Sequence, residues 1–258
     1  METRGADSSH QKEGQVETRL GTEEAAVGRY REERRLVLSA GSGVSLVPSS
    51  RAALTFDDGP DPIWTPRVLD ALRRADVPAT FFVVTPLALE YPDLISAMLD
   101  AGHVVEFHCT EHVRHTHLSR REVEADTREG LHALRRLGVE PRFWRPPWGV
   151  LAPWTEEVAE DFGLTLAPWS ADTRDWRGDA VQEMIRRIEP LLGPGTILLM
   201  HDALGPGALR RGCEETIALV EPLVTRLRSV GCEPALLTPP NVPVPTPAGP
   251  ERREEVGA

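Results

Sequence analysis

Two segments of the chain carry side chains that together could bind a divalent metal ion. Asp57 and Asp58 are adjacent near the end of an apolar run, and His108 and His112 lie four residues apart. Two imidazoles and one carboxylate leave coordination positions open for water and substrate, as a catalytic zinc site requires. Each segment also has an ordinary interpretation, because Asp is common in turns and histidine pairs are often surface or core residues. Only their combination indicates metal chemistry.

Three further charged residues follow other apolar runs and could serve acid–base catalysis. Arg145 precedes two prolines, Asp175 precedes Trp176, and His201 ends the apolar run that begins at Ile197. A structural salt bridge, an exposed acidic turn and a capped core histidine would explain them equally well one at a time. Their shared position after predicted strands favours a common site.

Alternating strand and helix patterns predict an α/β protein in which helices cover a mostly parallel sheet. The strands are expected at residues 52–56, 79–84, 103–108, 142–145, 164–169, 196–201 and 234–237. The helices are expected at residues 65–75, 86–101, 119–137, 154–162, 180–191 and 214–230. Ser119 followed by Glu122 forms a capping box, and Gly138 is a suitable helix stop. In a barrel or a doubly wound sheet, the candidate residues would gather where the strands end.

Composition bounds the domain, its partners and its compartment. We expect one domain over residues 51–238, a mostly disordered tail over 1–50 and a proline-rich disordered tail over 239–258. The net charge of −11 argues against nucleic acid as a partner. Neither a signal peptide nor a membrane span is evident, which predicts a cytoplasmic protein without a membrane partner. Cys109, Cys213 and Cys232 form no C-x-x-C pair, which agrees with a reducing compartment.

Five segments, taken in order, resemble the motifs of the polysaccharide deacetylase family, also known as the NodB homology domain or carbohydrate esterase family four. They are Thr55-Phe56-Asp57-Asp58-Gly59-Pro60, His108-x-x-x-His112, Arg145-Pro146-Pro147-Trp148-Gly149, Asp172-x-x-Asp175-Trp176 and Leu199-x-His201. The resemblance covers about residues 51–237. It implies a distorted TIM-like (β/α) barrel with seven or eight strands. It also implies hydrolytic removal of N-linked acetyl or similar acyl groups from amino sugars of a polysaccharide, oligosaccharide or glycoconjugate.

The resemblance also implies how the metal and the proton transfers are arranged. Asp58, His108 and His112 would hold one divalent ion, most often Zn²⁺, with Co²⁺ or another divalent ion as the alternative. Asp57 would be the general base, oriented by Arg145.

On the other side of the bond to be broken, His201 would be the general acid, kept protonated by Asp175. The backbone N–H of Trp148 would stabilise the oxyanion, and Leu199 would line the acyl pocket. Trp148 and Trp176 would stack on sugar rings, or else pack at the barrel rim.

Several positions depart from the family pattern. Cys109 stands where Ser or Thr is usual, Glu106 and Phe107 replace small and amide residues, and Trp148 replaces a frequent Tyr. These changes affect the expected loop geometry and substrate, and leave the proposed ligands and the acid–base pair intact.

Three alternatives stay open from the sequence. The same fold could deacylate a small-molecule amide. The segment His108-x-x-Glu111-His112 matches an inverzincin peptidase with Glu111 as base, which requires a helix. A non-catalytic barrel could bind glycans through Trp148 and Trp176.

Overall fold

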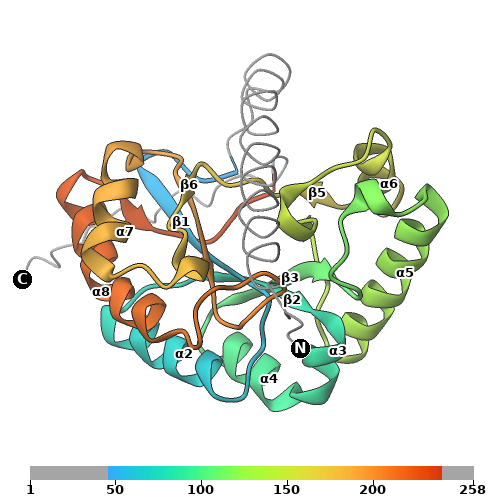
Figure 1. The fold of residues 1–258 in the computed structure, drawn as a ribbon, viewed down its shortest axis with the longest axis horizontal. Helices are drawn as coiled ribbons and strands as arrows, with labels where there is room; N and C mark the ends of the chain where they lie inside the picture. The colour runs from blue at the N-terminus through green and yellow to red at the C-terminus, as the bar shows by residue number, and fades with distance from the viewer. Residues whose placement is uncertain (1–45, 240–258) are drawn as a thin grey trace, which may run out of the picture.

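The computed structural model describes residues 46–239, whose core is a curled parallel sheet with helices on its outer face (Figure 1). The strands are β1 (Arg51–Asp57), β2 (Thr80–Val84), β3 (Val104–Cys109), β4 (Phe143–Trp144), β5 (Thr165–Leu166), β6 (Ala171–Asp172), β7 (Ile197–His201) and β8 (Glu233–Pro234). Their order is β5-β4-β3-β2-β1-β7-β6, and β8 pairs with β1. The predicted α/β barrel-like fold is confirmed, in the form of an open half-barrel that has β5 and β6 at its edges.

Helices connect most successive strands and cover the outside of the sheet. They are α2 (Trp64–Ala75), α3 (Thr85–Glu90), α4 (Pro92–Asp100), α5 (Arg120–Arg136), α6 (Thr155–Asp161), α7 (Val181–Ile188) and α8 (Glu214–Ser229). Short 3₁₀ turns lie at His115–His117, Pro147–Gly149, Asp175–Arg177 and Glu189–Leu191. Within residues 46–239, the structure contains no helix long and apolar enough to cross a membrane.

Strand alternation separates an apolar layer under the helices from the inside of the barrel. On β1, Leu54 and Phe56 belong to the large outer cluster, where Phe56 stacks on Phe81 with ring centroids 5.2 Å apart. Ala53 lies in a smaller cluster inside the barrel. The other buried members of that inner cluster are Val47, Phe82, Phe143, Ala167, Ile197 and Leu237. Thr55 and Asp57 follow Ala53 on the same face, so the inside becomes polar toward the carboxyl ends of the strands.

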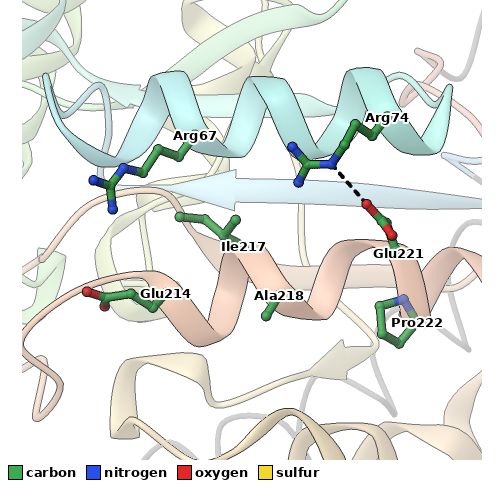
Figure 2. Close-up of a pocket in the computed structure, with 7 residues that line it drawn as sticks. All are labelled: Arg67, Arg74, Glu214, Ile217, Ala218, Glu221 and Pro222. Carbon is green, nitrogen blue, oxygen red and sulfur yellow. Dashed lines mark hydrogen bonds and ion pairs between the residues drawn. The ribbon is translucent and has the colours of Figure 1, made fainter.

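Helices α2 and α8 lie side by side in the outer layer (Figure 2). Arg74 Nε and Glu221 Oε1 are 3.0 Å apart, and both side chains are about half exposed. Such a surface ion pair contributes at most about 1 kcal/mol. The shallow pocket between these helices is lined by residues of α2 and α8 and shares none with the candidate site.

The structure corrects some of the predicted elements. The helix expected at residues 86–101 is two helices, because Pro92 begins α4 immediately after Tyr91. The strand expected at 164–169 is shortened to β5, and a separate strand, β6, follows Pro168. The capping box of Ser119 and Glu122 is present, and Gly138 has the positive φ of a helix stop.

The folded body extends beyond the domain limits expected from the sequence. Val47 is 2% exposed within the inner cluster, and the carbonyl of Leu46 accepts the N–H of Thr238. Residues 46–50 are therefore part of the packed domain. The remainder of the two predicted tails, 1–45 and 240–258, lies outside the described residues.

One buried carboxyl group joins β3 to the start of β4. Glu106 is 1% exposed and accepts the backbone N–H groups of Arg142 at 2.7 Å and Phe143 at 2.8 Å. Burial outweighs these hydrogen bonds and raises the pKa of Glu106 from 4.5 to about 7.

Glu106 should make stability depend on pH in the window between these two pKa values. Between pH 4.5 and about 7 the folded chain keeps a proton that the unfolded chain releases. Its contribution to the free energy of unfolding therefore falls as pH rises, by about 3 kcal/mol in total. Glu106→Gln should lose this slope in urea denaturation at pH 4.5, 5.5 and 7.5. Glu140→Gln, at a 75% exposed side chain, is the matched control; a pH-independent difference for Glu106→Gln would contradict the assignment.

Candidate active site

The three predicted metal ligands meet where β1 and β3 end. Asp58, His108 and His112 each offer one ligand atom, and these atoms lie within 4.8 Å of one another. Asp58 Oδ1 is 3.3 Å from His108 Nε2 and 3.1 Å from His112 Nε2. That oxygen is buried and has no hydrogen-bond partner within residues 46–239. One carboxylate oxygen and two imidazole nitrogens facing a common point suit a divalent cation such as zinc.

Electrostatics keeps Asp58 in the form that a cation would need. Burial opposes ionisation of this carboxyl, but His108, His112 and His201 outweigh burial and hold its pKa well below the ordinary value. Asp58 is therefore a carboxylate across the neutral pH range.

Main-chain contacts fix His108 from both sides. Its Nδ1 lies 2.5 Å from the carbonyl oxygen of Arg145, so an Nδ1–H donated there leaves the Nε2 lone pair toward Asp58. Trp144 Nε1 donates to the carbonyl of His108 at 3.0 Å. Sequence reasoning missed Trp144, which has the pattern of an ordinary core aromatic residue.

The loop that carries His112 is held by Asp126 of α5. The carboxylate of Asp126 accepts the N–H groups of Thr110 at 3.1 Å and Glu111 at 2.7 Å. The hydroxyl of Thr110 donates to the carbonyl of Asp126 at 3.0 Å. The hydroxyl expected to be missing at Cys109 is thus present one residue later in the loop.

The strand and loop geometry also decides against one rival. Because β3 ends at Cys109 and the following residues form a loop, His108 and Glu111 do not lie on a helix. The inverzincin arrangement requires these residues on one helix, so the structure contradicts it.

The turn around Asp58 is tightly packed. Asp58 has φ of +76°, a conformation that non-glycine residues rarely adopt outside functional sites. A Cβ at Gly59 would lie 2.3 Å from Asp202 Oδ2, and a Cβ at Gly205 would lie 1.9 Å from Asp58 Oδ2. A side chain at either position would displace one of these carboxylates, because the loops after β1 and β7 lie close together.

Asp57 and Arg145 form a buried ion pair inside the barrel. Arg145 is 1% exposed, and its Nη1 donates to Asp57 Oδ1 at 2.8 Å and to Thr55 Oγ1 at 2.7 Å. Its Nε donates to the carbonyl of Ala167 at 2.9 Å, and its guanidinium lies 4.1 Å from the ring centroid of Phe82. With this many partners the guanidinium has one orientation, and it fixes Asp57 in turn.

His201 and Asp175 form a second buried pair. His201 Nδ1 is 2.7 Å from Asp175 Oδ1, and the backbone N–H of His201 donates to Asp175 Oδ2 at 2.9 Å. Burial disfavours the imidazolium, but Asp175 outweighs burial and raises the pKa of His201 to about 9. Burial likewise opposes ionisation of Asp175, yet His201 and Arg210 lower its pKa to about 2. At neutral pH His201 is therefore protonated, with Nε2 as its available donor.

The three residues predicted to contact substrate or the oxyanion differ in how closely they join this group. The ring of Trp148 meets that of His112 edge-on, with centroids 4.2 Å apart, and the guanidinium of Arg114 lies 4.8 Å from the Trp148 ring. Leu199 is 5% exposed and occupies the same face of β7 as His201. Trp176 is half-buried, and its carbonyl accepts the N–H of Leu209; its stacking role stays a prediction.

Two further charged residues beside the site were missed by sequence reasoning. Asp202 is 1% exposed, accepts the hydroxyl of Thr65, and has its pKa raised by burial to about 7. Arg210 contacts Asp175 from the loop between β7 and α8. Asp202 is marked in the sequence only by its position after His201, and Arg210 belongs to no recognisable pattern.

Fold and site together define a class of enzyme. A parallel α/β barrel here carries an Asp–His–His cluster beside a fixed carboxylate and a protonated imidazole, all at the carboxyl ends of its strands. This is the arrangement of a barrel hydrolase that uses a divalent ion and acid–base catalysis.

Comparison with known proteins identifies the family. The family model for polysaccharide deacetylase matches residues 47–167. A chitooligosaccharide deacetylase of Sinorhizobium fredii is 35% identical over 187 residues, which cover 69% of this chain and 86% of that protein. A peptidoglycan-N-acetylglucosamine deacetylase of Listeria monocytogenes is also 35% identical, over 72% of this chain but only 37% of its own length.

A solved structure agrees with the sequence matches. The Bc1960 peptidoglycan N-acetylglucosamine deacetylase superposes with a TM-score of 0.69 at 27% identity, covering 75% of this chain and 89% of that one. The chain belongs to the polysaccharide deacetylase family, as its five motifs indicated. It is a hydrolase of carbon–nitrogen bonds other than peptide bonds, in a family that depends on divalent metal ions.

Asp175 should control the proton affinity of His201. Asp175→Asn removes the charge that raises the pKa of His201, so this pKa should fall from about 9 toward 6.5. Titration of ¹³C-labelled histidine by NMR measures it, and His201→Gln identifies the resonance. Asp179→Asn, which alters a nearby carboxylate that pairs with Arg187 rather than with His201, is the control and should leave the titration unchanged. A wild-type pKa near 6.5 would contradict the assigned pairing.

Proposed function

We propose that this protein is a metal-dependent deacetylase that removes N-linked acetyl or similar acyl groups from amino sugars of a polysaccharide, oligosaccharide or glycoconjugate. The observation that carries the proposal is the Asp58–His108–His112 cluster, with Asp57 held by Arg145 and His201 held by Asp175 beside it. The names of the relatives, which specify chitooligosaccharide and peptidoglycan N-acetylglucosamine, support the substrate class.

Asp58, His108 and His112 are proposed as the metal ligands. One oxygen and two nitrogen donors suit Zn²⁺, and Co²⁺ accepts the same donors. When bound, such a cation acidifies water and polarises the acyl carbonyl. The unpaired Oδ1 of Asp58 and the Nε2 of His108 are already directed at a common point.

Asp57 is proposed as the general base. Arg145 holds its carboxylate in one orientation, from which Asp57 takes a proton from the attacking water as the carbon–oxygen bond forms. The negative charge that develops on the acyl oxygen would be stabilised by the backbone N–H of Trp148. Trp148 has φ of +55° in the 3₁₀ turn Pro147–Gly149, and a backbone N–H is a suitable donor to an oxyanion.

His201 is proposed as the general acid. It gives its Nε2 proton to the amine nitrogen as the carbon–nitrogen bond breaks, which releases a carboxylic acid and a free amino sugar. Asp175 keeps the imidazole protonated before this step. Leu199, on the same face of β7, would contact the acyl methyl group, and Trp148 and Trp176 would contact sugar rings.

The remaining alternatives differ in testable ways. A small-molecule amide would use the same groups and is distinguished only by the substrate that is turned over. A non-catalytic glycan-binding barrel has no need for the Asp57–Arg145 and His201–Asp175 pairs, both of which this chain retains.

Metal removal should abolish acetate release. Purified protein should contain about one divalent ion per chain and release acetate from N-acetylglucosamine oligomers. Dialysis against a chelator should abolish release, and added Zn²⁺ should restore it. Asp58→Asn and His112→Gln should not recover with stoichiometric Zn²⁺. Full activity of the metal-free protein would refute the proposal. Acetate release from small amides alone would instead make a small-molecule amide the substrate.

The two proton-transfer residues should be separable from metal binding. Asp57→Asn and His201→Gln should each lower kcat by about 10² or more, because each removes one proton transfer, while metal content stays unchanged. Glu111→Gln changes an exposed carboxylate in the metal loop and should keep wild-type turnover. Retained turnover in Asp57→Asn and His201→Gln would remove both role assignments.

A further inference from the structure

A buried arginine lies behind the His201–Asp175 pair and is not explained by the chemistry above. The side chain of Arg210 is 4% exposed, and its Nη1 donates to Asp175 Oδ2 at 3.0 Å. Its Nη2 donates to the carbonyls of His201 at 2.9 Å and Ala203 at 3.0 Å. Nη1 also contacts the hydroxyl of Thr216, which itself donates to Asp175 Oδ2 at 2.7 Å.

These contacts join both sides of the site. β7 ends at His201, and Ala203 lies in the loop that follows, where Gly205 is so close to Asp58 that a Cβ there would overlap its carboxylate. One guanidinium therefore fixes the backbone of the proposed acid and the loop that supports a proposed metal ligand. A planar guanidinium is suited to this role, because its N–H donors have fixed directions.

The charges around His201 give Arg210 a second effect. Three carboxylates act on His201: Asp175 in the 3₁₀ turn Asp175–Arg177, and Asp57 and Asp58 at the end of β1. Arg210 acts on His201 indirectly, through its hydrogen bond to Asp175. The three carboxylates hold a proton on the imidazole, and Arg210 shares the charge of the carboxylate in direct contact with it. If Arg210 did not share the negative charge of Asp175, this carboxylate would hold the imidazolium proton of His201 more strongly, and the proton would be released less readily.

We propose that Arg210 is a positioning residue of this enzyme: it fixes Asp175 and the backbone of His201, and it shares the charge of Asp175 so that His201 can release its proton to the leaving amine. The inference rests on the proposed function for its catalytic consequence. The effect on His201 itself does not depend on any substrate.

The test compares Arg210→Met with Arg210→Lys and with Arg211→Met, all in the zinc-loaded full-length chain. Arg211 is the exposed neighbour, so its variant makes the same change in charge without touching Asp175. Arg210→Met should lower kcat by about tenfold or more, with KM and zinc content within about twofold of wild type. Its alkaline limit of kcat and the NMR pKa of His201 should both move upward by about one unit.

Arg210→Lys separates charge from geometry. It keeps the positive charge and loses the guanidinium geometry, so kcat should fall while the alkaline limit stays near that of the wild type. Arg211→Met should match the wild type in every measurement. If Arg210→Met does not fold, wild-type kcat in Arg210→Lys still overturns the positioning role.

Two other results decide the matter. An unchanged pKa of His201 in Arg210→Met would overturn the sharing of charge and leave only a structural role. If the wild type releases no acetate from any N-acetylated substrate, the proposed function fails. The NMR comparison would still decide whether Arg210 controls His201.

Discussion

The site depends on the compensation of negative charge on buried carboxyl groups. Asp57, Asp58, Asp175 and Asp202 are all at most 8% exposed and lie around the carboxyl ends of β1 and β7. An uncompensated buried carboxylate costs several kcal/mol, so each must be paired or protonated. Arg145 pairs with Asp57, two imidazoles face Asp58, and His201 and Arg210 share Asp175. Asp202 has no cationic partner among residues 46–239, and burial raises its pKa to about 7.

The buried carboxylates differ in their chemistry because each has a different partner. The guanidinium beside Asp57 is permanently charged, so it fixes this carboxylate in place at every working pH. The imidazoles beside Asp58 suit a shared cation. The imidazole beside Asp175 is protonated at neutral pH, because the carboxylate raises its pKa to about 9, and we propose it as the proton donor. In the proposed mechanism, three carboxylates thus serve as base, as metal ligand and as partner of the acid, each because of its neighbours.

Most of the fold and much of the site were predictable from local patterns. Strand alternation and the capping box at Ser119 depend on near neighbours in the chain, and polar residues after apolar runs located Asp58, His108 and His201. Interactions between distant segments were not predictable. Asp126 holds a loop about 15 residues away, and Arg210 reaches Asp175 across 35 residues. The division at Tyr91 and the short β6 were missed because a single proline can end an otherwise regular pattern.

The register of β1 and β7 has a consequence for how the family can diverge. Asp57 pairs with His201 along these parallel strands, as Thr55 pairs with Leu199. Their backbones are therefore held at the main-chain spacing of a sheet, roughly 4.8 Å, whatever side chains fill the outer layer. If the register of β1 and β7 slipped by one residue, either Asp57 or His201 would point toward the helices. The register is therefore strictly constrained, whereas the side chains of the outer layer can change. Mutation can replace most of the surrounding hydrophobic side chains and leave the separation of the two groups intact.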